Sequence, residues 1–261
     1  MRLAAFYYIL SWQIPFPYKK IPAMRPISEH RENAAGNGPG GLPGRLVVKT
    51  LFAVLVSSLM AVGALAADGI VRVLIPAGES APRGWIVKEW KGKADIDVVK
   101  TQFGNALHLK SANSSSAIYR ETDVDLKEFP YLNWRWMVTK TPKGADVRKK
   151  SADDQAAQVY VVFPRWPETV NSKLLGYIWD SSAPAGHAFH STKSRNTRYV
   201  VLRSGQAGLG EWLHEKRNVY DDYRALFKEE PPKAGGISIM IDSDDTDSSA
   251  ESFIGDIYFS R

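Results

Sequence analysis

The sequence predicts a mainly β protein: an antiparallel β-sandwich of jelly-roll character with one short amphipathic helix. From residue 67 onward, apolar and polar residues alternate in short runs, which is the pattern of strands that bury one face. Gly, Pro, Asn, Asp and Ser interrupt these runs at short intervals, as turns between strands require. A single segment near residue 220 carries its apolar residues at helical spacing instead.

About ten strands are expected from this alternation. The candidate runs are Ile70 to Ile75, Trp85 to Trp90, Ile96 to Gln102, Leu107 to Ser111, Ala117 to Thr122, Tyr131 to Thr139, Gln158 to Phe163, Leu174 to Trp179, Arg198 to Arg203, Ile237 to Asp242 and Ser252 to Phe259. No internal repeat and no long linker divides this part of the chain. Residues 67–261 are therefore expected to form one β-sandwich domain.

The expected helix begins after Asn218, a residue type that caps helix N-termini, and ends before Pro231. Asp221 and Asp222 stand in its first turn, where carboxylates interact favourably with the helix dipole. Its apolar stripe consists of Val219, Tyr220, Tyr223, Leu226 and Phe227. Such a helix is expected to cover one end or face of the sandwich through this stripe.

A secretory signal peptide is expected at residues 45–66. Arg45 and Lys49 supply its basic start, residues 51–62 its apolar stretch, and Ala64–Ala66 the small residues of a cleavage site. The mature protein is then expected in the periplasm or outside the cell, with no membrane span after cleavage. An uncleaved membrane anchor is the alternative interpretation of this stretch.

Residues 1–44 do not resemble the short basic start of an ordinary signal peptide. They combine a brief apolar run with a stretch rich in Gly, Pro and Asn at residues 33–44. We expect this extension either to be absent from the native protein or to be disordered.

Composition excludes several classes of function. The chain holds 34 basic and 28 acidic side chains, but residues 1–66 carry seven of the former and two of the latter. The expected mature part is therefore nearly neutral, at +1, and shows no basic surface for nucleic acid. Cysteine is absent, which excludes disulfides, thiolate nucleophiles and thiolate metal sites.

Several strings in order carry a resemblance to a known family. They are Tyr131-Leu-Asn-Trp-Arg-Trp136, Ala152-Asp-Asp with Val159-Tyr-Val-Val-Phe163, Tyr177-Ile-Trp179, Val201-Leu-Arg-Ser-Gly205, Asn218-Val-Tyr-Asp-Asp-Tyr-Arg224, Asp242-Ser-Asp-Asp-Thr246 and Gly255-Asp-Ile-Tyr-Phe259. From about Gly84 to the C-terminus the chain resembles the bacterial domain-of-unknown-function 3047 family, which implies no activity. More loosely, its plan of short strands is similar to that of jelly-roll carbohydrate-binding modules, an analogy of fold alone.

Alternation along residues 131–139 separates a core face, which includes Trp134 and Trp136, from a face that carries Arg135. Aromatic rings stack on the apolar faces of sugars, and guanidinium groups bind hydroxyls or carboxylates. We therefore expect a glycan-binding face whose members come from several strands: Arg135, Tyr160, Tyr177, Trp179 and Arg203. The alternative is that both faces of the sheet are buried and these aromatic residues are core.

Acidic residues concentrate after the run that ends at Asp242. The loop Asp242-Ser-Asp-Asp-Thr-Asp247 has four carboxylates in six residues, which repel unless solvated or neutralised by a cation such as Ca²⁺. It lacks the Gly and Glu of an EF-hand loop. The candidate calcium ligands are Asp242, Asp244, Asp245 and Asp256. A solvated acidic turn is the alternative, and the same holds for Asp153-Asp154.

No catalytic motif stands out: the mature chain contains no His-Glu-x-x-His, Gly-x-Ser-x-Gly or phosphate-binding Gly-rich string. The sequence therefore favours a non-catalytic module that binds carbohydrate or envelope polysaccharide. Two alternatives stay open. One is a polysaccharide hydrolase or lyase that uses carboxylates near Asp153, Asp154 or Asp242; the other is a structural envelope protein without a soluble ligand.

Overall fold

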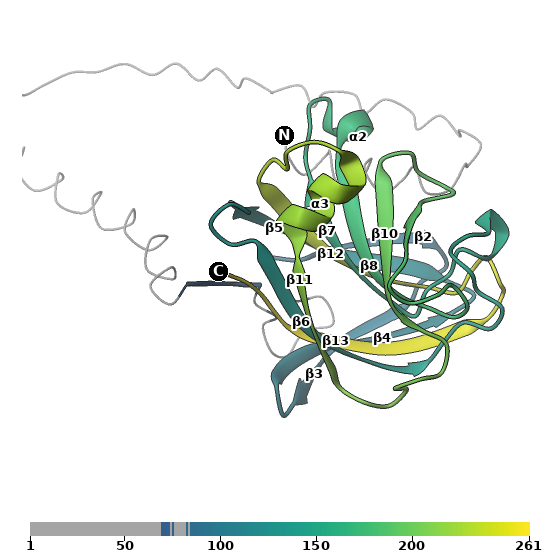
Figure 1. Ribbon diagram of the computed structural model, residues 1–261. Coiled ribbons are helices and arrows are strands. Elements are labelled where there is room, and N and C mark those ends of the chain that lie inside the picture. The colour runs from purple at the N-terminus through teal and green to yellow at the C-terminus, as the bar shows by residue number, and fades with distance from the viewer. Residues whose placement is uncertain (1–68, 74, 76–81, 83) are drawn as a thin grey trace, which may run out of the picture. The chain divides into compact units, whose positions relative to one another are not determined.

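Two β-sheets pack face to face in the computed structural model, which describes residues 69–73, 75, 82 and 84–261 (Figure 1). The expected extension at residues 1–44 and the expected signal peptide at residues 45–66 lie outside the described residues. Within the described part, no helix is both long enough and apolar enough to span a membrane.

The first sheet has six strands in the order β11-β6-β13-β4-β3, and β1 pairs with β13 beside this path. Their bounds are Ile70–Val73 for β1, Asp95–Thr101 for β3, Gly104–Ala112 for β4, Tyr131–Lys140 for β6, Leu213–Asn218 for β11 and Ser249–Ser260 for β13. The pairs within this sheet are all antiparallel.

The second sheet has seven strands in the order β2-β5-β12-β7-β8-β10-β9. Their bounds are Ile86–Lys91 for β2, Ser115–Val124 for β5, Ala157–Phe163 for β7, Lys173–Asp180 for β8, Ala188–His190 for β9, Thr197–Ser204 for β10 and Ala234–Asp242 for β12. A short 3-10 turn, η2 (Lys150–Ala152), precedes β7, and a one-turn helix, α2 (Glu168–Asn171), precedes β8.

Successive strands cross between the sheets, which gives the sandwich its jelly-roll character. From β4 to β7 the chain alternates between the six-stranded and the seven-stranded sheet, and β12 then lies between β5 and β7 while β13 lies between β4 and β6. The expected β-sandwich is therefore confirmed, and all eleven candidate runs overlap strands.

Two features of the sheets differ from the expectation. Strands β8 and β10 are parallel. After β8 the chain forms the edge strand β9, and β10 then runs antiparallel to β9 in the position between β9 and β8. The other difference is that β9 and β11 were not expected. Strand β9 has three residues, and the residues of β11 that point inward include Glu215 and Arg217, so neither shows apolar alternation.

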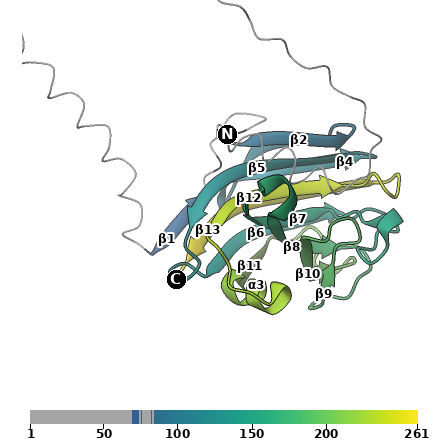
Figure 2. The ribbon, with the colours of Figure 1, turned by 90° about the horizontal axis from the view of Figure 1, so that it is seen from above.

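The expected helix is confirmed as α3 (Val219–Phe227), which follows β11 directly (Figures 1 and 2). The Asn218 side chain accepts a hydrogen bond from the Asp221 amide at 3.1 Å. The helix ends before the prolines, because Lys228 adopts a left-handed conformation with φ of 59° and its amide donates to the Arg224 carbonyl. Tyr223, fully buried, packs on the ring of Phe163.

The main core lies between the two sheets and contains large rings. Trp134 lies 5.5 Å from Trp136 and 5.3 Å from Tyr177, and Trp136 lies 6.0 Å from Trp179, between ring centroids. Because Trp134 and Trp136 are fully buried while Arg135 is partly exposed, the expected division of β6 into two faces is confirmed.

Candidate functional site

Two of the rings expected to bind sugar lie in the core instead. Tyr177 and Trp179 are fully buried and face Trp134 and Trp136 between the sheets. The Tyr177 hydroxyl donates to Asp222 at 2.8 Å, and Trp179 Nε1 donates to the Gly205 carbonyl at 3.1 Å. The expectation of an open face at these two residues is therefore wrong, because β8 turns the alternate residues that carry these rings toward the other sheet.

Tyr160 is also fully buried, but on the opposite face of the seven-stranded sheet. Its ring lies against Gly176, where a Cβ would be only 2.7 Å from the Tyr160 ring, and its hydroxyl donates to Gln158. Tyr199 packs beside it at 6.2 Å between ring centroids. Both faces of this sheet are thus buried around Tyr160, as the alternative interpretation predicted.

The two arginines of the expected site lie in different places. Arg203 forms an ion pair with Glu215 at 2.7 Å, and Glu215 also accepts from Trp136 Nε1 at 3.1 Å, so Arg203 closes an edge of the core. Arg135 lies on the outer face of the six-stranded sheet, where its guanidinium stands 4.2 Å over the ring of Phe103. Among the five expected residues, Arg135 thus contacts a partly exposed ring, that of Phe103.

The outer face of the six-stranded sheet carries a cluster of four half-buried rings, Phe103, His108, Trp212 and Phe253, which we call the ring cluster. His108 and Phe253 are stacked, with centroids 4.1 Å apart. Trp212 lies 5.8 Å from Phe103 and 6.2 Å from Phe253. These contacts form a continuous aromatic surface that solvent reaches.

Polar groups border the ring cluster. Glu251 lies 2.8 Å from His108 Nε2 and accepts from the Thr139 hydroxyl at 2.8 Å, and Lys110 Nζ lies 3.3 Å from it. Hydrogen bonds from His108, Thr139 and Lys110 outweigh partial burial and lower the pKa of Glu251 to about 2. The face therefore combines rings with a fixed negative acceptor and, at Arg135, a positive donor.

Sequence reasoning did not identify the four rings of this cluster as site residues. Phe253 could have been found, because alternation along β13 places it opposite Ile254, which is buried. Phe103 lies in the turn between β3 and β4, and Trp212 precedes β11. Since turns and loops have no fixed period, no pattern indicated that these two rings lie on the same face.

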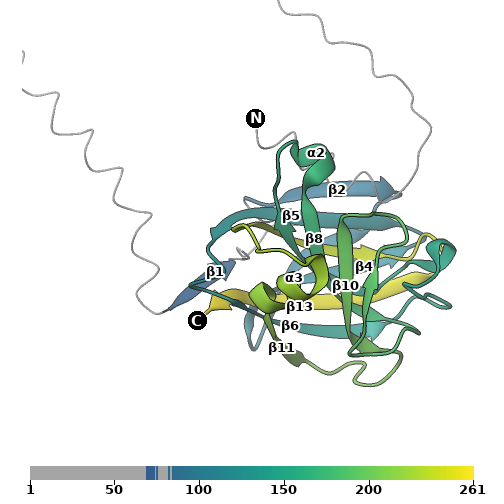
Figure 3. The same cartoon turned by 45° about the horizontal axis from the view of Figure 1, so that its top comes forward.

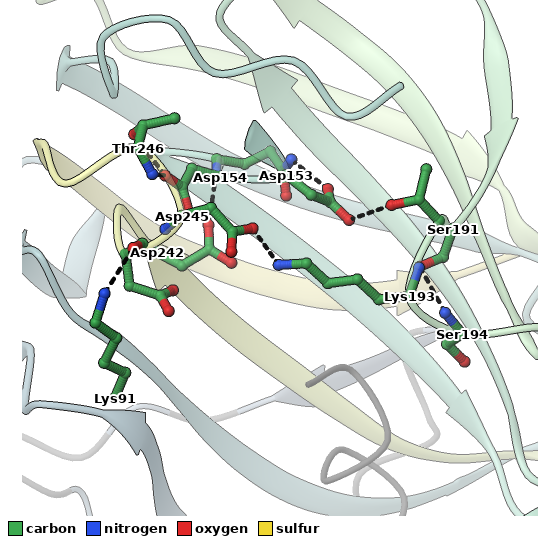
Figure 4. Close-up of polar contacts among 12 residues, drawn as sticks. Lys91, Asp153, Asp154, Ser191, Lys193, Ser194, Asp242, Asp245 and Thr246 are labelled. Atoms are coloured by element: carbon green, nitrogen blue, oxygen red, sulfur yellow. Dashed lines mark hydrogen bonds and ion pairs between the residues drawn. The ribbon is translucent and has the colours of Figure 1, made fainter. Parts of the chain in front are cut away.

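A second candidate site is an acidic cluster where two loops meet (Figure 4). Asp154 lies before β7, whereas Asp242 and Asp244 lie at the end of β12 and just after it. The three residues are buried, and each offers a carboxylate oxygen within 4.8 Å of the other two. Asp153 and Asp245 border this cluster (Figure 4).

Hydrogen bonds between the two loops hold the cluster together. Asp154 accepts from the amides of Asp245 and Thr246 at 3.1 and 2.8 Å, and from the Thr246 hydroxyl at 2.5 Å. Asp242 accepts from the Gln155 amide at 2.6 Å. Each loop therefore uses a carboxylate to fix the backbone of the other.

The charges of the acidic cluster are only partly balanced. Lys193 forms an ion pair with Asp245, and Lys91 donates to the Asp244 carbonyl at 2.8 Å (Figure 4). Burial raises the pKa of Asp153 to about 6 and raises the pKa values of Asp242 and Asp244 as well. Five carboxylates with two lysines thus make a strongly negative site that favours protons or a cation.

The four expected calcium ligands do not all meet. Asp242 and Asp244 belong to the acidic cluster, where they are joined by Asp154 rather than by Asp256. Asp245 borders the cluster and faces Lys193. Asp256 lies in a bulge of β13, 3.4 Å from Arg135 and 3.7 Å from Arg72. The expectation that Asp256 is a calcium ligand together with Asp242 and Asp244 is therefore wrong, because the bulge directs its carboxylate toward these arginines.

Burial also bears on the catalytic alternative. Asp153, Asp154 and Asp242 are 2%, 0% and 4% exposed. A polysaccharide chain has no access to carboxylates covered to this extent, since a glycosidase must place its carboxyl groups on both sides of the scissile bond.

Together these observations define a jelly-roll-like β-sandwich with a half-exposed ring cluster on one face and a buried acidic cluster between two loops. Residues 83–258 match the family described as "Protein of unknown function (DUF3047)", and the chain belongs to this family. The expected family resemblance is thereby confirmed. No curated protein matches the chain.

Several solved structures are similar to the chain. One is the family 30 carbohydrate-binding module of the cellulosomal cellulase Cel9D-Cel44B of Clostridium thermocellum, with 11% identity and a TM-score of 0.45 over 73% of this chain and 96% of that one. Another is the family 11 module of Lic26A-Cel5E from the same organism, with 9% identity and a TM-score of 0.38 over 68% and 87%. A third is a cellulase derived from Cel12A of Rhodothermus marinus, with 10% identity and a TM-score of 0.41 over 68% and 92%.

Proposed function

We propose that this protein is an exported, non-catalytic carbohydrate-binding protein that holds a glycan or envelope polysaccharide on the outer face of its six-stranded sheet. The observation that carries the proposal is the ring cluster: four half-buried rings in continuous contact, with Arg135 at 4.2 Å from Phe103 and Glu251 at 2.8 Å from His108. Rings bind the apolar faces of sugars, and charged groups beside them bind hydroxyls.

A glycan panel with product analysis tests this proposal. The protein is expected to bind at least one polysaccharide without releasing new reducing or unsaturated ends. New ends would support the hydrolase or lyase alternative instead. Absence of binding across neutral and acidic polysaccharides would contradict the proposal and favour the structural envelope protein.

The ring cluster is tested by Trp212→Ala. Loss of this half-exposed ring should weaken glycan binding by about 1–3 kcal/mol, the usual range for an aromatic interface anchor, while the unfolding transition stays cooperative. Trp166→Ala is the matched control, because Trp166 is 86% exposed and lies before α2, on a different element. Equal affinity of the Trp212 variant and the wild type, measured by calorimetry, would exclude the ring cluster as the binding face.

Export is supported by the signal-peptide pattern of residues 45–66. We expect a mature chain that begins at Ala67 and is recovered from the periplasm or the medium. Mass spectrometry of the protein isolated from cells checks this. A chain recovered from the cytoplasm with residues 45–66 intact would contradict the export proposal.

We further propose that the acidic cluster binds a calcium ion through Asp154, Asp242 and Asp244. The donor set fits, since Ca²⁺ prefers several carboxylate and carbonyl oxygens, and the cluster carries more negative charge than Lys91 and Lys193 neutralise. The candidate role is structural, because the cluster joins the loop before β7 to the loop after β12.

Thermal unfolding with CaCl₂ or with EDTA tests the calcium proposal. Calcium should raise the melting temperature, because a ligand that binds the folded state stabilises it, and Asp244→Asn should remove the effect. Asp247→Asn is the matched control, since Asp247 lies in the same loop but its side chain is 76% exposed. A calcium response that is absent in the wild type, or unchanged in the Asp244 variant, would contradict the proposal.

A further inference from the structure

Two large apolar side chains of the described residues are exposed to solvent, and both lie on the connection from β7 to β8. Trp166 is 86% and Val170 41% exposed. Trp166 lies just before α2 and Val170 lies within it, and α2 directly precedes β8 (Figure 3). We call residues 165–171 the Trp166 tip. An indole this exposed gains free energy when an apolar partner covers it.

Hydrogen bonds hold the Trp166 tip in its exposed position. Asn171 Nδ2 donates to the Trp166 carbonyl at 2.9 Å, and Asn196 Nδ2 donates to the Val170 carbonyl at 2.6 Å. The Arg165 amide donates to the Ser172 hydroxyl at 3.2 Å. The fold therefore supports the backbone of the tip from both ends and from the neighbouring β9–β10 loop.

Basic side chains surround the Trp166 tip. Arg165 precedes Trp166, and Lys173 follows α2; both pair with Glu229, at 2.7 and 2.8 Å. Arg195 lies next to Asn196, and Arg198 Nη1 donates to the Arg195 carbonyl at 2.8 Å. Neither Arg195 nor Arg198 forms an ion pair with a carboxylate in the described part of the chain.

The cationic excess of this surface is therefore supplied by Arg195 and Arg198. The acidic side chains of the same region are Glu168, within α2, and Glu229, which already binds two cations. Arg195 is exposed, whereas the Arg198 guanidinium donates to the Arg195 and Thr197 carbonyls and stands 5.1 Å over the Phe227 ring. An exposed apolar tip with this positive charge beside it is complementary to an anionic lipid surface.

We propose that the Trp166 tip is a contact for an anionic phospholipid membrane, with Trp166 and Val170 inserted at the headgroup level and Arg195 against lipid phosphates. Tryptophan favours the membrane–water interface, and basic side chains favour anionic lipid surfaces. Two apolar side chains are far fewer than a specific protein interface needs, at roughly 800 Å² per partner. Shallow insertion into a bilayer, in contrast, requires no more than a small apolar tip flanked by charge.

Sedimentation of the protein, as isolated from cells, with two kinds of vesicle tests the proposal. One kind is phosphatidylcholine alone, and the other contains phosphatidylglycerol as well. We expect binding to the anionic vesicles, a decrease at high salt because exposed charges are screened, and little binding to the neutral ones. No binding to anionic vesicles at low salt would overturn the proposal, and a glycan as occupant would leave both kinds of vesicle unbound.

Substitutions test whether vesicles bind at the Trp166 tip or elsewhere on the molecule. Trp166→Ala should reduce binding to anionic vesicles about tenfold or more, and Arg195→Glu should reduce it with a weaker dependence on salt. Trp212→Ala is the matched control, because it removes a ring from the ring cluster on the six-stranded sheet. The assignment would be overturned if Trp166→Ala left vesicle binding unchanged, or if Trp212→Ala abolished it. Circular dichroism verifies that each variant is folded.

Discussion

Glu215 shows how one residue joins the strands that surround the core. It lies on β11 with its side chain 12% exposed, and it accepts from Trp136 Nε1 while pairing with Arg203 of β10. Removal of a carboxylate in this position leaves two donors without their partner, which costs more than the hydrogen bonds themselves contribute. A charged residue in an inward position is therefore structural here.

Asp153 makes the stability of the molecule depend on pH. Burial raises its pKa from 3.8 to about 6, against the opposing effect of Lys193 and the hydrogen bond from Gln155. A raised carboxyl pKa favours the protonated, folded form, so this contribution is complete below about pH 4 and is lost as the pH rises through about 6. In the absence of divalent cations, the free energy of unfolding should therefore increase when the pH is lowered from 7 to 5.

Asp153→Asn tests this pH dependence. Asparagine keeps an oxygen for Gln155 but does not titrate, so the slope between pH 5 and 7 should fall by up to about 1.4 kcal/mol per pH unit, the value for one proton. Urea unfolding at several pH values in EDTA measures it. Asp247→Asn, a change at an exposed carboxylate, should leave the slope unchanged. An identical slope for wild type and the Asp153 variant would contradict the raised pKa.

At the scale of the elements, α3 ends at Lys228, whose left-handed backbone conformation is unfavourable for a residue with a Cβ. Lys228 has φ of 59° and ψ of 34°, and its amide closes the last turn on Arg224. Glycine adopts this left-handed conformation without the steric cost of a Cβ. Lys228→Gly should therefore raise the free energy of unfolding by about 0.5–1 kcal/mol.

Urea unfolding measures the effect, and Lys228→Ala is its control, because alanine removes the same side chain but keeps the Cβ. The alanine variant should be no more stable than the wild type. Equal stabilisation by both substitutions would show that the lysine side chain, rather than the backbone conformation, limits the end of the helix.

Elements differ in how well the sequence predicts them, and the difference has physical causes. Strand β6 alternates between buried and partly exposed residues, and α3 has a cap and an apolar stripe, so both could be predicted. Strand β11 could not, because Glu215 and Arg217 take inward positions and find partners in Arg203 and Asp222. The hydrophobic pattern of a sequence predicts which apolar residues are buried, but it does not predict charged residues that point inward and form ion pairs in the folded protein.

The candidate site was predicted less well than the fold, because alternation divides a strand into two faces without telling what covers each. Tyr177 and Tyr160 illustrate this, since they lie on opposite faces of one sheet and both are buried. Arg135 lies partly exposed on the outer face of its sheet, on the side of β6 that the alternation predicted. The rings around it, Phe103 and Trp212, lie in a turn and a loop, where no period applies.

At the scale of the whole molecule, the last two strands complete both sheets. Strand β12 lies between β5 and β7, and β13 lies between β4 and β6 while also pairing with β1. Interior positions of both sheets are thus filled by the last two strands. Contacts between residues far apart in sequence dominate such a topology, which makes folding slow and dependent on the complete chain.

A chain that ends at Asp247, and so lacks β13, tests this dependence. It leaves β4 and β6 without the strand that joins them and removes the buried Ile254 and Phe259 from the core, so we expect loss of the cooperative unfolding transition in near-ultraviolet circular dichroism. Deletion of Arg261 alone is the control, since it removes an exposed ion pair with Glu128 and should change stability by less than about 1 kcal/mol. A cooperative transition in the shortened chain would contradict this expectation, because it would show that the remaining strands fold without β13.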